Sequence, residues 1–390
     1  MIARKRLDIG WRDLALGLGA CLWAGKPRGN AFCDSESLVC LSIRSGFDLL
    51  LATLALPAGS EVLISVTIPA MPRILAEHGL TPVPVDLDPA TLSVTAEALR
   101  KAVTPRTKAI LVAHLFGSQM DMEPVLAVAR ENHLFVIEDC AQAFTGPTFK
   151  GHPESDVRMF SFGPIKTATT IGGAVLFIRD AALRAKIQER QATYPRQSRF
   201  SYFRRLWVFS IFKLVLAPGP YAVVIGLLRR SGQNHDEVVT SMGQSFTGAD
   251  FFVKIRHQPC VALRRLLDHR LRTYPASRVE DRAAAGRQVL AALPEGTVLG
   301  EKAPVHTFWV FPILTDAREK LLPRLWAAGF DAASGATSLS AIEPPPGLPE
   351  TRATAAEAAL SRVLYLPVYA VIPPPERQRL AEIVRASLPQ

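Results

Sequence analysis

The sequence lacks several features that would assign it to a familiar class of protein. Its five cysteines are an odd number and form no Cys-x-x-Cys pair, so we expect a reduced cytoplasmic protein and predict no metal site. No Gly-x-Gly-x-x-Gly segment follows the first predicted strand, which argues against a nucleotide-binding Rossmann protein. No nucleic-acid-binding module accompanies the net charge of +10. Phosphorylated ligands or an anionic membrane surface explain this charge as well, so we predict no nucleic-acid partner.

Uninterrupted apolar runs of membrane-spanning length are also missing. Near the N-terminus, Asp13 interrupts a short apolar patch, so we predict no signal peptide. The longest apolar block, residues 206–228, is divided by Lys213 and by Pro218-Gly219-Pro220 into halves too short to cross a bilayer. It is flanked by four arginines, namely Arg204, Arg205, Arg229 and Arg230. Two interpretations stay open: a hairpin lying in one leaflet with its arginines at the headgroups, or a hairpin buried in the core or in a dimer interface.

What the chain does contain is regular alternation of strand-like and helix-like segments. Its 390 residues exceed one typical core, so we expect two lobes. Apolar runs at 61–66, 82–86, 108–113 and 134–138 alternate with helical patterns at 69–79, 95–102 and 122–132. This alternation predicts an α/β fold with a mostly parallel sheet. We predict a large domain over 1–240, with 206–228 as an apolar hairpin insertion, and a small C-terminal domain over 241–390.

Polar side chains stand where two of the strand-like runs end. The run Leu134–Ile137 stops at Glu138 and Asp139, and the run Met159–Phe162 leads to Lys166. Ligands of open α/β sheets collect at such strand ends. A carboxylate and an amine suit pyridoxal phosphate, which needs a lysine for its aldehyde and an acid for its ring nitrogen. The alternative is that Asp139 caps a helix and that Lys166 is an ordinary surface group.

The residues around this pair resemble a known family. "EDCAQA" (138–143), "SFGPIK" (161–166) and the following "GGA" resemble the signature of the DegT/DnrJ/EryC1/StrS sugar aminotransferases. The stretches 60–94 and 103–139 and the C-terminal "LSRVLYLPVY" are similar to the same family. The resemblance is strong over about 60–180, weak at both ends and hard to trace over 200–250.

The resemblance implies a fold, a cofactor and a set of site residues. The fold would be that of the type I pyridoxal-phosphate enzymes, with a large lobe built on a mixed, mostly parallel sheet and a smaller C-terminal α/β lobe, in a homodimer. Lys166 would be the catalytic lysine and Asp139 the partner of the ring nitrogen. Gln142 would lie near the ring, while Ser161 and the turn at Gly46 would bind the phosphate, at a helix N-terminus that favours an anion.

Four departures from the family pattern surround this core. Phe47 stands where the family has a phosphate-binding threonine, and Ile68 falls where an aromatic covers the ring. An asparagine that reaches the neighbouring subunit's phosphate is missing, with Phe252 at the nearest position, and the segment 329–345 has no histidine. None of these departures touches Lys166 or Asp139, so cofactor binding is better supported than a nucleotide-sugar substrate.

The function predicted from the resemblance is transfer of an amino group, from an amino acid such as glutamate, to a nucleotide- or lipid-linked keto-sugar. Such a step belongs to cell-surface polysaccharide or glycolipid biosynthesis. The block 206–228 adds the expectation of contact with a membrane, at its cytoplasmic face. Two alternatives stay open: a catalytically weakened family member that binds or regulates a partner, and a pyridoxal-phosphate enzyme of another reaction type.

Overall fold

The computed structural model describes residues 1–390 except 5, 24, 231–247, 249, 335–338 and 389–390. The helices are α1 (Trp11–Leu22), α2 (Ile43–Leu54), α3 (Ala70–Glu77), α4 (Ala96–Ala102), α5 (Glu123–Asn132), α6 (Ala181–Thr193), α7 (Arg199–Val215), α8 (Pro218–Arg230), α10 (Phe251–Ile255), α11 (Val261–Thr273), α12 (Ser277–Leu290), α13 (Arg318–Ala327), the short η1 (Pro349–Thr351), α14 (Thr354–Arg362) and α15 (Pro374–Arg385). The strands are β1 (Ser37–Cys40), β2 (Glu61–Ile64), β3 (Thr81–Pro84), β4 (Thr107–Ala113), β5 (Ser118–Gln119), β6 (Phe135–Asp139), β7 (Val157–Ser161), β8 (Ala174–Ile178), β9 (Val305–His306), β10 (Phe311–Leu314) and β11 (Val363–Leu366).

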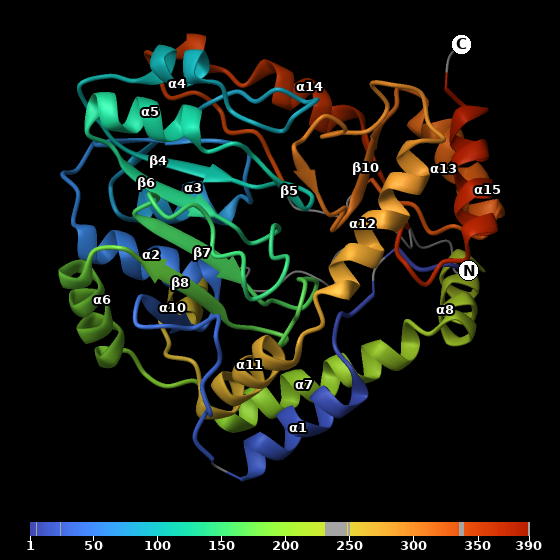
Figure 1. Ribbon diagram of the computed structural model, residues 1–390, viewed down its shortest axis with the longest axis horizontal. Helices are drawn as coiled ribbons and strands as arrows, with labels where there is room; N and C mark the ends of the chain where they lie inside the picture. Colours follow the sequence, from blue (N-terminus) through green and yellow to red (C-terminus); the bar gives the residue numbers. More distant parts are fainter. Residues whose placement is uncertain (5, 24, 231–247, 249, 335–338, 389–390) are drawn as a thin grey trace.

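A seven-stranded sheet forms the centre of the large lobe, in the order β1-β8-β7-β6-β4-β2-β3 (Figure 1). The strands β7, β6, β4, β2 and β3 run parallel to one another. Strand β8 runs antiparallel to both of its neighbours, β1 and β7. The helices α3, α4 and α5 connect the parallel strands, as the alternation over 61–140 predicts. The predicted mixed, mostly parallel sheet is therefore confirmed.

Both faces of this sheet are buried, which explains the near-continuous apolar character of its strands. Val62 and Ile64 of β2 belong to the core shared with α2 and α3. Leu63, between them, belongs to the core on the opposite face, together with residues of α4 and α5. Helices on both faces leave only the ends of the strands open to a ligand.

The smaller lobe is built on the antiparallel pair β10–β11, with α12, α13 and α15 packed around its own core. The predicted domain boundary at 240/241 lies outside the described residues, and the division stays a prediction. Beyond that boundary, α10 contributes Phe251 and Ile255 to the core of the large lobe.

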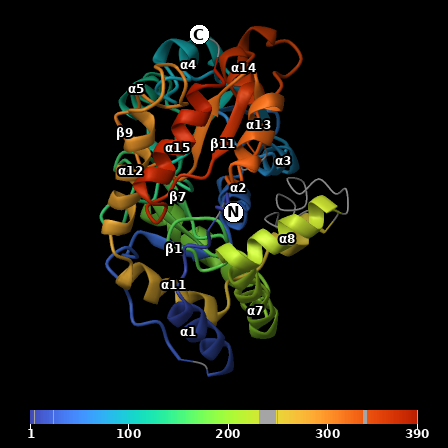
Figure 2. The same ribbon diagram turned by 90° about the vertical axis from the view of Figure 1, so that its right-hand side faces the viewer.

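A layer of helices lies beneath the sheet as Figure 1 shows it, where α1, α7 and α11 run side by side. The sequence pattern did not predict α1, because the segment 1–40 has little periodicity; packing of α1 on α7 and α11 forms a separate core. The apolar block 206–228 falls in α7 and α8, which meet at 89° (Figure 2). Among the described residues no single helix is long and apolar enough to cross a membrane, although α7 and Gly219–Ile225 pass that test as a bent pair.

The apolar residues 305–314 predict one continuous strand, and this prediction is wrong. The structure divides it into β9, which pairs with β5, and β10, which pairs with β11. Phe308 between them has a left-handed backbone with φ of 47°. Thr307 donates its N–H to the carbonyl of Gly117 at 2.8 Å. This contact holds the turn against the large lobe and brings Trp309 to the strand ends of the sheet.

The close approach at Gly117 generates a testable prediction about stability. A Cβ at Gly117 would lie 2.5 Å from the backbone nitrogen of Trp309, whereas a Cβ at Gly59 would meet nothing within 4 Å. Both residues have left-handed backbones, with φ of 97° and 78°. Gly59→Ala should therefore cost only the conformational term of about 1–2 kcal/mol. Gly117→Ala should lower the free energy of unfolding by roughly 2 kcal/mol more, because the clash is with backbone. Urea unfolding of both variants measures the difference, and equal losses would contradict the contact.

Candidate active site

The predicted site residues meet at the carboxyl ends of the parallel strands. A cavity of about 390 Å³ opens there. Five of the seven predicted residues line it, namely Lys166, Asp139, Gln142, Ser161 and Ile68. The register explains the meeting: Asp139 ends β6, opposite Ala113 of β4 and Met159 of β7, and Ser161 ends β7 two residues further on. The volume is that of a small-molecule site.

Asp139 is a nearly buried carboxylate, with a residue exposure of 6%. Burial raises the pKa of its carboxyl, and the N–H of Ala141 together with the positive charges of Lys166 and Arg44 opposes that rise. The Ala141 N–H donates to Oδ1 at 2.8 Å. Among the described residues the carboxylate makes no other hydrogen bond, and it lines the cavity. A cationic N–H within the cavity would complete its partners.

Lys166 lies on the loop between β7 and β8, with its Nζ 4.1 Å from the centre of the Trp309 ring. The Trp309 Nε1 donates to the carbonyl of Ile165 at 3.0 Å, which fixes the indole beside the lysine. Because an indole face attracts a cation and excludes water, Trp309 holds the amine at the edge of the cavity. The sequence pattern predicts Trp309 only as part of a strand and gives no sign of this role.

Gln142 and Ser161 also line this cavity. The Oε1 of Gln142 accepts the N–H of Phe116 at 2.8 Å. This bond orients the amide so that its NH₂ group is the end that can donate to a ligand. Ser161 is opposite Ala174 of β8 and presents its side chain to the same cavity.

Gly46 and Phe47 do not line the cavity as the structure describes it. The side chain of Ser42 accepts the N–H of Ser45, so α2 begins one turn before the predicted turn. The first turn of the helix, from Ser42 to Arg44, faces the cavity instead. Phe47 is fully buried in the core, and a Cβ on Gly46 would lie 2.5 Å from Leu176. Their assignment as cofactor-binding residues stays a prediction, and their observed contacts are with the core.

The loop that carries Lys166 is held from outside the sheet. Asp8 accepts the N–H of Ala168, which has a left-handed φ of 54°. From α7, the Tyr202 hydroxyl donates to the carbonyl of Thr170 at 2.7 Å, and Arg205 Nε donates to that of Ile171 at 2.6 Å. The N-terminal segment and α7 thus fix the loop that carries Lys166.

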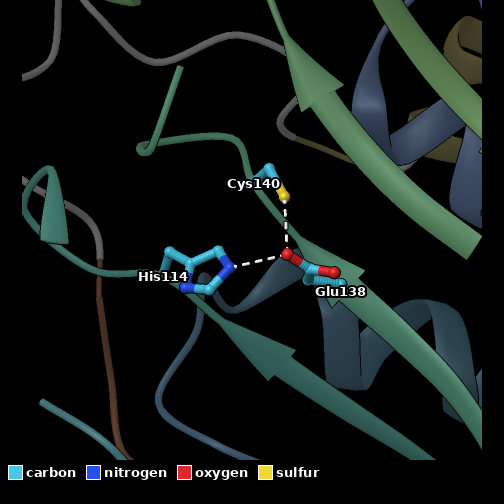
Figure 3. A group of neighbouring side chains, drawn as sticks. All are labelled: His114, Glu138 and Cys140. Atoms are coloured by element: carbon cyan, nitrogen blue, oxygen red, sulfur yellow. Dashed lines mark hydrogen bonds and ion pairs between the residues drawn. The ribbon is translucent and has the colours of Figure 1, made fainter. Parts of the chain in front are cut away.

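Behind Asp139 lies a buried group of side chains, His114, Glu138 and Cys140, that could by type hold a metal ion (Figure 3). His114 Nε2 donates to Glu138 Oε1 at 2.8 Å, because its Nδ1 accepts the N–H of Met120. The Cys140 thiol donates to the same oxygen at 3.3 Å. Burial first, and then the charge of Glu138, raises the pKa of Cys140 well above its usual value, so the thiol stays protonated.

The second oxygen of Glu138 is also saturated. Oε2 accepts the N–H of His152 at 2.8 Å and the hydroxyl of Ser155 at 2.7 Å. With every acceptor position filled by a donor, the group forms a complete hydrogen-bond network without an ion. The network ties the end of β4 to the end of β6 and so supports Asp139 from behind.

The comparisons with known proteins agree with this geometry. The sequence pattern of the DegT/DnrJ/EryC1/StrS aminotransferase family matches residues 33–210. This segment is similar to that family over slightly less than half of the chain. A GDP-perosamine synthase of Caulobacter vibrioides is 35% identical over 201 residues, which are 48% of this chain and 54% of that protein. A UDP-N-acetyl-3-dehydro-α-D-glucosamine 3-aminotransferase of Acidithiobacillus ferrooxidans is 36% identical over 38% of this chain and 42% of its own length. The chain thus spans about half the length of the curated relatives that it matches.

Solved structures extend the likeness in fold to nearly the whole chain. The aminotransferase TlmJ of Streptoalloteichus hindustanus superposes with a TM-score of 0.70 and 19% identity, over 99% of this chain and 98% of its own. NtdA of Bacillus subtilis, solved with its cofactor PMP, superposes with a TM-score of 0.66 and 18% identity, over 96% and 82%. These likenesses confirm the predicted type I fold.

The residues of the cavity fit the cofactor of the family, pyridoxal phosphate. The cofactor needs an amine, a carboxylate for the ring nitrogen and an anion-binding end. Lys166 and Asp139 supply the first two in one cavity, and the start of α2 lines the same cavity. The cavity therefore fits pyridoxal phosphate by the chemical types of these groups.

Glu138 generates a second prediction. Glu138→Gln places an NH₂ group against buried donors and should lower the free energy of unfolding by about 3 kcal/mol. Burial acts to raise the pKa of Glu138, but the hydrogen bonds from His114, Ser155 and the His152 N–H lower this pKa overall, below its usual 4.5. As the pH falls, the unfolded state therefore binds the proton before the folded state does. The contribution of Glu138 to the free energy of unfolding is full above pH 4.5 and is lost as the pH falls further.

Urea unfolding of wild type and Glu138→Gln from pH 7 to pH 3 measures this contribution as a difference between the two proteins. Glu154→Gln is the matched control, because Glu154 forms an exposed pair with Arg130. A difference that stayed constant down to pH 3 would contradict the assigned ionisation of Glu138.

Proposed function

We propose that this protein is a pyridoxal-phosphate-dependent aminotransferase that acts on a keto-sugar. The observation that carries the proposal is the presence of the Lys166 amine and the Asp139 carboxylate in one cavity at the strand ends. When bound, pyridoxal phosphate supplies the electron sink that lets an amino group leave one carbon and reach another. Lys166 is the residue that holds the cofactor and that moves the proton during the transfer.

The other residues of the cavity orient and shield this centre. Asp139 would accept a hydrogen bond from the ring nitrogen of the cofactor and would keep that nitrogen positive. The amide of Gln142 is oriented by Phe116 and could donate to the cofactor ring, while Ile68 would cover the ring without aromatic stacking. Trp309 excludes water from the Nζ of Lys166, where the proton is carried.

The class of substrate is proposed from the relatives. Those with curated names act on sugars linked to GDP or UDP. A keto-sugar linked to a nucleotide or to a lipid is therefore the proposed acceptor, with an amino acid such as glutamate as the donor. Synthesis of a cell-surface polysaccharide or glycolipid is the proposed setting. The homodimer that the family resemblance implies, and a cytoplasmic location consistent with five unpaired thiols, belong to the same proposal.

The absorbance spectrum with added pyridoxal phosphate tests the central step. Wild type should develop a band near about 410–430 nm, the range of a lysine-bound cofactor, and Lys166→Ala should not. Lys101→Ala, which removes an exposed amine on α4, should behave as wild type. Glutamate should then bleach the band.

Each other outcome favours a different function. No band in wild type would favour the weakened, partner-binding protein, and a band that survived in Lys166→Ala would overturn the role of Lys166. A band that glutamate leaves unchanged, together with another product from an amino acid, would favour a different reaction type.

Contact with a membrane is proposed from the exposed apolar side chains. Nine of the thirteen large apolar side chains that the structure shows as exposed lie in α1, directly after it, or in α7 and α8. We call them the apolar face: Trp11, Leu22, Trp23, Phe200, Trp207, Val208, Ile211, Leu214 and Val223. The spacing of those on α7 places them along one side of the helix.

The charges beside this face favour an anionic lipid surface. Helix α7 contains four basic residues and no acidic one. Arg199 and Arg204 of α7 and Arg12 of α1 are exposed next to the apolar residues. Cations flanking an apolar face are typical of helices that lie in the headgroup region. The predicted block 206–228 covers only part of this face, because α1 was not foreseen.

Sedimentation with vesicles tests this contact. Wild type should bind vesicles of anionic lipid more than neutral ones, and Trp207→Ser/Ile211→Ser/Leu214→Ser should lose most of the binding, because each side chain contributes about 1–2 kcal/mol of burial. The matched control changes three exposed valines elsewhere, Val253, Val305 and Val371, to serine. Unchanged vesicle binding by the first variant would contradict the proposal, and a shift from dimer to monomer would show a subunit interface instead.

A further inference from the structure

The cavity contains more positive charge than the proposed chemistry uses. Its described lining includes Arg44, Arg73 and Arg205 besides Lys166, and Asp139 is the acidic residue among them. Arg73 lies over the Phe251 ring, at 4.6 Å from its centre. Arg44 makes no hydrogen bond or ion pair with the described residues. A cavity with this excess of cations is suited to an anion.

Arg205 reaches the cavity from α7, near the end of the segment that matches the family pattern. Its Nε donates to the carbonyl of Ile171 at 2.6 Å, which fixes the guanidinium on the loop before β8. Gly173 of that loop donates its N–H to the carbonyl of Leu41 at 2.8 Å. Leu41 directly precedes Ser42, the N-cap of α2. Arg205 therefore lies beside the first turn of α2.

The strand register brings Ser161 to the same place. Cys40, Ala174 and Ser161 are opposite one another across β1, β8 and β7. The residues that follow this row toward the cavity are the start of α2 and the glycine pair 172–173. The first turn of α2 and Ser161 thus line the same cavity as Arg44 and Arg205, and a helix N-terminus favours an anion.

The positive charge of Arg205 disfavours the charged form of Arg44. Burial lowers the pKa of Arg44, the charge of Arg205 lowers it further, and Asp139 opposes the shift. Burial likewise lowers the pKa of Arg205. An anion between them would relieve both effects, and two guanidinium groups present the paired donors that phosphate oxygens accept.

We propose that Arg44 and Arg205 bind the phosphate group of the cofactor, together with Ser161 and the first turn of α2. The proposal rests on the proposed function, since it takes pyridoxal phosphate as the ligand. It gives a charged replacement for the hydroxyl that is absent at Phe47. It also makes α7, a helix of the apolar block, part of the cofactor site.

Comparison of pyridoxal phosphate with pyridoxal, which lacks the phosphate, tests the proposal in each variant. The readout is the concentration of each compound that half-saturates the absorbance band of the lysine-bound cofactor. Wild type should prefer the phosphate form strongly. Arg44→Gln and Arg205→Gln should each reduce this preference by about 10-fold or more, the effect of losing one charge-assisted contact. Lysine at either position should restore part of it.

Arg204→Gln is the matched control, because Arg204 is the exposed neighbour of Arg205 on the same helix. Each preference is the ratio of the two half-saturating concentrations measured on one variant. A smaller folded fraction affects both concentrations alike and leaves their ratio unchanged. The glutamine at position 205 keeps an N–H donor for the carbonyl of Ile171.

The outcomes separate this proposal from the proposed function. A wild-type band with an unchanged preference in both arginine variants would overturn the phosphate site and leave the aminotransferase standing. Equal weakening of both compounds would assign the arginines a structural role and overturn it as well. An unchanged preference with a raised KM for a nucleotide-linked sugar would assign them to the substrate diphosphate instead. No band in wild type would overturn both proposals.

Discussion

The burial of one carboxylate governs the arrangement of this site. Asp139 ends a central strand with 6% of its surface exposed, and a charge in that position requires compensation. The compensation comes from three directions, since Lys166 follows β7, Arg44 starts α2 and the Ala141 N–H follows β6. The network of Glu138 behind it fixes the strand end itself. Because these groups are tied to the sheet, the cavity is shaped before any ligand arrives.

The parts of the site that could be predicted from the sequence are those that local pattern determines. Apolar runs ending in a single polar residue predicted Asp139 and Lys166 at one rim, because parallel strands end at the same edge of a sheet. The resemblance to the family added Gln142 and Ser161, which line the cavity. The helix-strand alternation over 61–140 is confirmed for the same reason, since each of its elements has a strong period of its own.

The parts that could not be predicted depend on contacts between distant segments. Helix α1 has a weak pattern and is stabilised by packing on α7 and α11. Trp309 faces Lys166 because a left-handed turn at Phe308 interrupts an otherwise strand-like run. Ser42 starts α2 early and turns Phe47 into the core. The arginines flanking the apolar block suggested lipid headgroups, yet Arg205 lines the cavity while its neighbour Arg204 is exposed.

Helix α7 has two faces with unrelated tasks, and this limits how the protein can be engineered. Its inner side holds the Lys166 loop through Tyr202 and Arg205, and Tyr221 of the following α8 donates its hydroxyl to Asp331 of the small lobe. Its outer side is exposed and apolar. Deleting the block 206–228 to obtain a more soluble protein would therefore disturb the packing of α7 against the Lys166 loop. It would also remove the contact between Tyr221 and Asp331. Surface redesign limited to the outer side keeps both supports.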